Sequence, residues 1–177
     1  MGAAKLADQL DVSVDQAKNV LKQFNDKLPF LKQLNSGVQR RLEDPRSSGS
    51  IRSILGRKCR FNMWEPAAFG MNKSMPYEEA VAAYGPTTRL QRAMTYKALN
   101  RLIQASAADM TKAAWLQCCE AGHLPMVQVH DEMAFSVETQ DEARKLSSIM
   151  SNAVPLCIPN RCDIDMGPSW GEAVEIA

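Results

Sequence analysis

The stretch "MVQVHDEMAFSV", residues 126–137, is the most informative part of the sequence. Apolar residues alternate with other residues on both sides of a His130-Asp131-Glu132 triplet, which is typical of two paired strands joined at that triplet. The triplet contains no glycine, asparagine or proline, the residues that make tight turns easy. Two adjacent carboxylates repel each other, and a divalent cation or a metal-bound phosphate relieves that repulsion. The sequence therefore predicts a β-hairpin with an acidic tip that suits a metal ion, with an ordinary exposed acidic turn as the alternative.

Helices are expected on both sides of this hairpin. Residues 88–120 contain no glycine or proline and repeat apolar residues at three- and four-residue steps, which predicts one long helix capped at 87–88. A shorter helix is expected near 139–153 with Thr139 as its cap, and a last strand at about 160–166.

The first third of the chain has the same helical character. A short helix is expected at 3–10, and the Ser-x-x-Gln sequence at 13–16 has the form of a capping box. Apolar residues then recur with helical spacing to about residue 42, which predicts an amphipathic helix bent near Pro29. Residues 50–61 favour strands. The predicted fold class is therefore α+β, with long helices packed on a small antiparallel sheet that includes the hairpin.

Length and composition narrow the class of protein. A chain of 177 residues suits one domain, and its net charge of +1 makes no case for a nucleic-acid partner. The five cysteines are odd in number and form no Cys-x-x-Cys pair, and the chain has two histidines, so a zinc site is not expected. No apolar run approaches the roughly 20 residues that span a membrane. We expect a cytoplasmic protein with reduced thiols and no membrane partner.

Basic residues are concentrated in one part of the chain. Seven of them lie between Arg40 and Arg60, with only Glu43 and Asp44 as acidic neighbours. This basic segment suits the binding of phosphates, and a solvated surface loop explains it equally well.

The predicted long helix carries a second, polar pattern at four-residue steps, formed by Arg92, Tyr96, Asn100 and Gln104. Amide side chains can contact the acceptors that every base pair presents in the minor groove. Spacing alone favours an ordinary polar face or packed amides over such a contact.

The hairpin sequence resembles the third polymerase motif of family A DNA polymerases. Four other stretches resemble segments of that family in the same order along the chain: residues 1–34, 54–61, 98–114 and 165–173. The resemblance therefore covers essentially the whole chain. It departs from the family at Tyr96, where many members have Arg or His, and at Ala105, where Gly is common.

The resemblance implies template-directed DNA synthesis, in which a primer 3′-hydroxyl attacks the α-phosphate of a deoxynucleoside triphosphate (dNTP). It implies that Asp131 binds catalytic Mg²⁺, that Glu132 is a supporting carboxylate and that His130 approaches the primer terminus. The implied partners are primer–template DNA and dNTP. Candidate DNA contacts are Arg92, Tyr96, Asn100, Gln104, Arg57 and Lys58.

Part of the family's catalytic machinery has no counterpart in this sequence. A two-metal site needs a second aspartate, which the family supplies from an Asp-Tyr/Phe-Ser-x-x-Glu pattern, and no stretch here has that form. The resemblance thus implies the C-terminal part of a polymerase domain, with residues 1–85 from the fingers and connecting segment and 86–177 from the palm. Half of the metal site would come from an N-terminal remainder, and the chain by itself would be inactive. The alternatives are a non-catalytic duplex-DNA-binding protein and a structural subunit of a replication complex.

Overall fold

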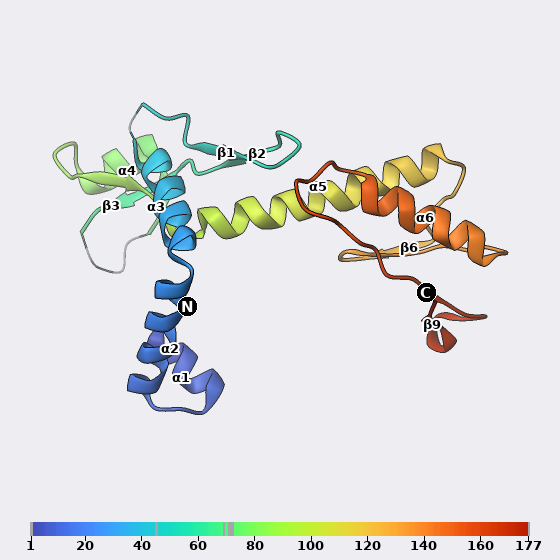
Figure 1. Cartoon of the computed structure of the whole chain (residues 1–177). Helices are drawn as coiled ribbons and strands as arrows, with labels where there is room; N and C mark the ends of the chain where they lie inside the picture. The colour runs from blue at the N-terminus through green and yellow to red at the C-terminus, as the bar shows by residue number, and fades with distance from the viewer. Residues whose placement is uncertain (1, 45, 69, 71–72, 177) are drawn as a thin grey trace. The chain divides into compact units, whose positions relative to one another are not determined.

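The computed structural model describes residues 2–44, 46–68, 70 and 73–176 (Figure 1). The described helices are α1 (Ala3–Leu10), α2 (Val14–Lys27), α3 (Pro29–Glu43), α4 (Tyr77–Tyr84), α5 (Ala98–Glu120) and α6 (Gln140–Asn152). The described strands are β1 (Ser50–Arg52), β2 (Lys58–Arg60), β3 (Met63–Pro66), β4 (Met75–Pro76), β5 (Leu90–Arg92), β6 (Val127–Val129), β7 (Glu132–Ala134), β8 (Asp165–Met166) and β9 (Val174–Glu175). The predicted α+β class is confirmed, although the strands form four small sheets instead of one.

Packing divides the chain into two compact units. The first consists of Met1–Ile51 and Lys58–Leu102, and the second of Arg52–Arg57 and Ile103–Ala177. The hairpin with the acidic tip belongs to the second unit. The functional division after residue 85 stays a prediction.

The N-terminal helices form where the local signals place them. Helix α2 begins with a complete capping box, in which Gln16 N–H donates to Ser13 Oγ and Ser13 N–H donates to Gln16 Oε1. Helix α2 ends before Pro29, which is the first residue of α3 and has no N–H to continue the ladder. The predicted bend is therefore a break at Leu28 between two helices.

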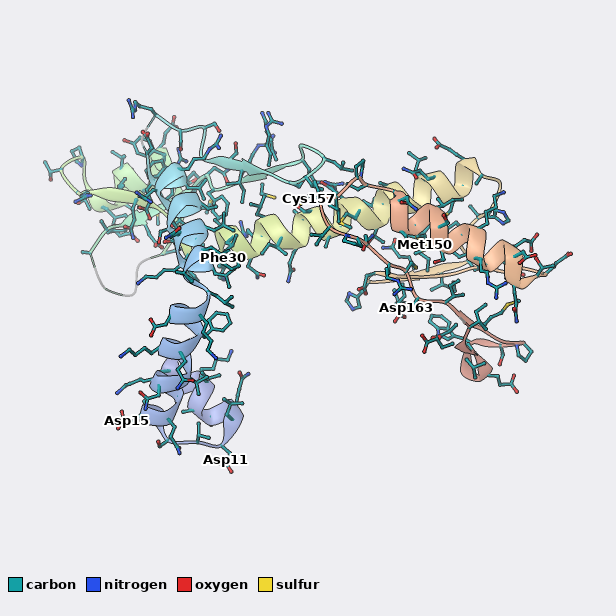
Figure 2. All side chains as sticks on the ribbon, in the orientation of Figure 1. Asp11, Asp15, Phe30, Met150, Cys157 and Asp163 are labelled. Atoms are coloured by element: carbon teal, nitrogen blue, oxygen red, sulfur yellow. The ribbon has the colours of Figure 1, made fainter. Side chains whose placement is uncertain are left out.

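The core of the first unit joins the end of α3 to the strands that follow it. Leu42, Ile51, Phe61 and Ala98 are buried together, and Val38, Cys59 and Leu102 pack against them. Apolar burial of this kind is the main stabilising contribution of a small core. By contrast, large apolar side chains on the N-terminal helices stay exposed, such as Phe30, which is 58% exposed (Figure 2).

The prediction of one helix over residues 88–120 is wrong at its start. Residues 90–92 form β5, which pairs antiparallel with β3, and Thr95–Lys97 form a short 3₁₀ helix before α5 begins at Ala98. Met94, with φ of 59°, breaks the helical path between them. Three residues are too few to distinguish a helical from a strand period, and pairing with β3 decides between the two.

In the second unit, α6 is tied to the long helix α5. Thr139 and Glu142 form the predicted capping box of α6, and Ala143 and Leu146 are buried. Gln117 Nε2 of α5 donates to the carbonyl of Ala153 at 3.0 Å, which fixes the end of α6 against α5.

The predicted strand at 160–166 is shorter than expected. Only Asp165–Met166 form a strand, β8, which pairs antiparallel with β9. Residues 160–164 follow an irregular path along α6, where Ser151 Oγ accepts from Cys162 N–H at 3.0 Å and Ser147 Oγ donates to the Cys162 carbonyl at 2.8 Å. These side-chain bonds satisfy the backbone N–H and carbonyl of Cys162, which a neighbouring strand would otherwise pair.

Candidate functional site

The predicted hairpin is formed, with the triplet at its tip. Strands β6 and β7 pair antiparallel, and Val129 lies opposite Glu132, so His130 and Asp131 are the two central residues of the turn. A side-chain hydrogen bond within the hairpin supports the turn: Gln128 Nε2 donates to the His130 carbonyl at 2.9 Å.

The backbone of the turn takes a conformation that its sequence does not favour. His130 has a φ of 54°, at the first central position of a two-residue hairpin loop. Turns with a positive φ at that position usually carry glycine there, because a Cβ atom is strained in the left-handed region. Strained residues of this kind gather at functional sites, so the observation supports a role for the tip.

The acidic tip is open to solvent. His130, Asp131 and Glu132 are all exposed, and across the described residues no ion pair neutralises either carboxylate. Nor do the described residues bring three or more His, Cys, Asp or Glu side chains into a group that could hold a metal ion. The two carboxylates fit Mg²⁺, which prefers oxygen ligands and one or two carboxylates with substrate phosphates.

The two amides predicted to contact DNA lie on helix α5. Asn100 and Gln104 are exposed and four residues apart, so they point from the same side of the helix. Exposure excludes the alternative in which these amides are buried in packing. An ordinary polar face and a minor-groove contact both remain compatible with this position.

The other two members of the polar pattern do not continue it, because neither lies on α5. Tyr96 belongs to the 3₁₀ helix and is 66% exposed, with Lys97 Nζ 5.6 Å from the centre of its ring. Arg92 is half-buried in β5, where its guanidinium stacks on Trp64 at 4.5 Å and donates to the carbonyls of Phe61 and Ser47 at 2.9 and 3.3 Å. These contacts give Arg92 a structural role, and its predicted contact with DNA stays a prediction that they do not support.

Arg57 is held by a buried carboxylate that the sequence analysis did not single out. Asp109 of α5 is 1% exposed, and its Oδ1 accepts from Arg57 Nε at 2.7 Å and lies 2.7 Å from Arg57 Nη2. Its Oδ2 accepts a short hydrogen bond from Ser53 Oγ. The bond from Ser53 and the positive charge of Arg57 lower the pKa of Asp109 against the opposing effect of burial, so this carboxylate is charged at neutral pH.

A sequence signal for Asp109 does exist. Asp109 lies seven residues after Leu102, which places an acidic residue on the apolar side of α5. A charge on the buried side of a helix requires a partner. That reasoning predicts a buried ion pair but cannot identify Arg57, which is 52 residues away in the sequence.

The basic segment is partly paired within the protein. Arg46 forms an ion pair with Asp44 at 3.1 Å, and Arg52 Nη1 donates to the Gly56 carbonyl at 2.9 Å. Lys58 is exposed in β2. The segment therefore presents fewer unpaired cations than its sequence suggests.

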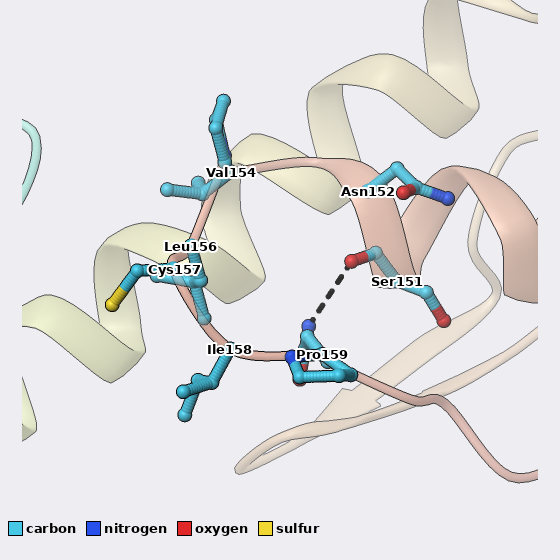
Figure 3. Close-up of a pocket in the computed structure, with 9 residues that line it drawn as sticks. Ser151, Asn152, Val154, Leu156, Cys157, Ile158 and Pro159 are labelled. Carbon is cyan, nitrogen blue, oxygen red and sulfur yellow. Dashed lines mark hydrogen bonds between the residues drawn. The ribbon is translucent and has the colours of Figure 1, made fainter.

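A cleft of about 600 Å³ lies where the chain leaves α6 (Figure 3). It is lined by residues 151–152 and 154–160, and Asn160 Nδ2 donates across it to the Ser151 carbonyl at 3.3 Å. None of the lining residues carries a charge. The cleft offers no carboxylate for a metal and no cation for a phosphate, and the predicted site residues lie elsewhere.

Comparisons with known proteins agree on one family. The model of DNA polymerase family A matches residues 1–172. A DNA-directed DNA polymerase of Pseudomonas phage M6 is 34% identical over 97% of this chain and 22% of its own length. DNA polymerase I of Treponema pallidum is 28% identical over 97% of this chain and 16% of its own length.

A solved structure gives the same result. The chain resembles the POL domain of Pol1 from M. smegmatis, in complex with DNA primer-template and dNTP, with a TM-score of 0.61 and 29% identity over 90% of this chain and 26% of that one. The chain spans about a fifth of the length of the curated relatives named above. Separately, in the part of the chain that the structure describes, no helix is both long and apolar enough to cross a membrane.

Proposed function

The chain belongs to DNA polymerase family A, and on that premise we propose that it supplies the C-terminal catalytic part of a polymerase that extends a DNA primer. The observation that carries the proposal is the hairpin tip, where two exposed carboxylates, without an ion-pair partner among the described residues, follow a strained His130. In the reaction, the primer 3′-hydroxyl loses its proton to water as O3′ forms a bond to the α-phosphorus of a dNTP, the bond from that phosphorus to the oxygen bridging it to the β-phosphate breaks, and pyrophosphate leaves. The polymerase with bound DNA primer-template and dNTP that this chain resembles supports these partners.

Asp131 would hold the catalytic Mg²⁺, and Glu132 would contribute to the same acidic surface. When bound, the ion supplies Lewis-acid stabilisation of the charge that develops on the phosphate. The described residues offer only this pair of carboxylates at the tip, so we propose that a second aspartate comes from an N-terminal remainder of the polymerase, in the same chain or a separate one. The 177-residue chain by itself would then extend no primer.

The other predicted residues would bind and orient the DNA. Asn100 and Gln104 are exposed and would donate to minor-groove acceptors, which checks base-pair geometry without reading sequence. His130 would hydrogen-bond the primer's terminal nucleotide. Arg57 and Lys58 would contact the DNA backbone, with Tyr96 as a further exposed donor near the start of α5.

Exposed apolar surface supports a polymerase remainder as a partner. In the first unit, Phe24 and Phe30 are 51% and 58% exposed. In the second unit, Val127 and Val129 of the short hairpin are each 42% exposed. Paired strands left with open edges and apolar faces associate with further chain.

The test is a chimera in which this chain replaces the matching segment of the Pseudomonas phage M6 polymerase. Asp131→Asn removes the metal-binding charge, and we expect primer extension to fall on the order of a thousandfold while duplex affinity is retained. Asp163→Asn is the matched control, because Asp163 is also an exposed aspartate of the second unit (Figure 2) and has no predicted role in catalysis. Extension at the rate of the unsubstituted chimera would exclude a catalytic role for Asp131.

The alternative is a non-catalytic duplex-DNA-binding or structural subunit of a replication complex. It is favoured if Asp131→Asn changes neither extension nor DNA affinity. Against it, a turn without catalytic work has no physical reason to keep two adjacent carboxylates beside a strained His130.

A further inference from the structure

We propose that Asp109 is a positioning residue that, with Ser53, aims the guanidinium of Arg57 at a phosphate of bound duplex DNA. The inference rests on the proposed function, because it needs this chain to bind a duplex. It goes beyond that function by giving a role to a buried carboxylate remote in sequence from the acidic hairpin.

The ion pair leaves part of the guanidinium free for a ligand. Nε and Nη2 of Arg57 both meet Oδ1 of Asp109, and in the described structure Nη1 has no protein partner. The side chain of Arg57 is 51% exposed, although the carboxylate that holds it is buried. A guanidinium has five N–H donors in a rigid fork, so Arg57 can be held by Asp109 and still present donors to a phosphate.

The loop that carries Arg57 is itself fixed. Arg57 N–H donates to Ser53 Oγ at 3.0 Å, and Ser53 N–H donates to the Arg57 carbonyl at 2.9 Å. Ile54 N–H donates to Ser106 Oγ of α5 at 3.1 Å. Because the loop and the side chain are ordered before DNA arrives, binding does not have to order them, and that saving raises affinity.

The sign of one substitution separates positioning from simple charge. Asp109→Asn removes a negative charge near the DNA, so electrostatics alone predicts tighter duplex binding. Positioning predicts weaker binding, because Arg57 loses its charged anchor and becomes mobile. The opposite signs make this substitution decisive.

The experiment is a double-mutant cycle on the 177-residue chain, with the affinity for a fluorescein-labelled primer–template duplex measured by fluorescence anisotropy. The variants are the unsubstituted chain, D109N, R57Q and R57Q/D109N. Glutamine at position 57 keeps an N–H donor for Asp109 without the charge. We expect D109N to weaken binding by about threefold to tenfold when Arg57 is present, and to cause no loss in the R57Q background.

Arg52 provides the matched control. Arg52 is the last residue of β1, directly before the loop, and is exposed, but its guanidinium donates to the Gly56 carbonyl, and in the described structure it forms no bond to Asp109. D109N should therefore weaken binding by the same factor in an R52Q background as in the unsubstituted chain.

Three results would overturn the proposal: tighter binding of D109N, an equal loss from D109N with and without the R57Q substitution, or no duplex binding by the unsubstituted chain. The last result also removes the DNA contacts of the proposed function, whereas the first two leave them intact.

If D109N fails to fold, the R57K variant tests the proposal instead. Lysine keeps the positive charge but cannot form the two contacts that Nε and Nη2 of the arginine guanidinium make with Asp109. R57K should bind more weakly than the unsubstituted chain although it keeps the charge, and binding equal to that of arginine would overturn the proposal.

Discussion

At the scale of single residues, the catalytic role proposed for the hairpin tip and the fold make opposing demands on His130. The two-residue turn needs a positive φ at its first central position, and glycine meets that need without strain. Histidine at this position places an imidazole next to Asp131, but its Cβ atom makes the backbone strained, which glycine would avoid. A locally unfavourable residue beside paired carboxylates is what a functional site shows when chemistry, and not folding, selects the side chain.

His130→Gly tests this conflict. We expect the free energy of unfolding to stay unchanged or to rise by up to about 1 kcal/mol, because glycine relieves the strain. We expect primer extension by the phage chimera to fall by about tenfold, because a hydrogen bond to the primer terminus is lost. Urea unfolding and a primer-extension assay measure the two effects. His130→Asn, which tolerates a positive φ and keeps a polar side chain, should lose less activity. Equal extension by all three proteins would remove His130 from the site.

At the scale of elements, Arg92 holds the three-stranded sheet β4-β3-β5 to the chain around it. Its guanidinium lies on Trp64 of β3 and donates to two carbonyls, those of Phe61 and Ser47. Gly49, with φ of 60°, leaves the space that the guanidinium fills, and a Cβ atom there would overlap it. An arginine that reads as a DNA contact in the sequence thus acts as a cross-link between β5, β3 and the segment after α3.

Arg92→Ala should destabilise the first unit by about 2 kcal/mol or more, since it leaves two carbonyls without their charged donor and removes the cation–π contact. Urea unfolding followed by tryptophan fluorescence measures the change, because Trp64 lies in β3 and its surroundings change when this unit unfolds. Arg89→Ala is the control: Arg89 is exposed and near β5, and its backbone bond to Ala67 is retained. Equal stability of the two variants would show that the Arg92 contacts contribute little.

At the scale of the whole molecule, the net charge of +1 hides an uneven distribution. Arg46 and Arg57 of the basic segment form ion pairs within the protein, although Arg57 keeps free donors, and Lys58 is exposed. The proposed DNA binding would therefore depend on a few local contacts and not on the overall charge.

We expect the affinity of the chain for duplex DNA to fall with salt, with log K against log salt giving a slope of about −2 to −3, as two or three neutralised phosphates require. Anisotropy titrations over a range of salt concentrations measure the slope. Replacing both Arg57 and Lys58 by glutamine should flatten it by about 2, whereas Asp163→Asn should leave it unchanged. A slope near zero for the unsubstituted chain would contradict backbone binding.

The sequence by itself determined the features that depend on neighbours along the chain. The capping boxes at Ser13 and Thr139, the interruption at Pro29 and the turn at His130 each rest on contacts within about four residues, so their signals are local. The position of the acidic tip was predictable for the same reason. The resemblance of this stretch to a polymerase motif is likewise a property of consecutive residues.

Only the tertiary structure decided the features that depend on distant partners. Residues 90–92 have a helical pattern, but pairing with β3 makes them a strand. Arg92 and Arg57 look alike in the sequence, yet one is packed on Trp64 and the other is held by Asp109 with free donors in solvent. The physical reason is that a side chain's role is set by the groups that packing brings to it, and the partner of Arg57 is 52 residues away along the chain.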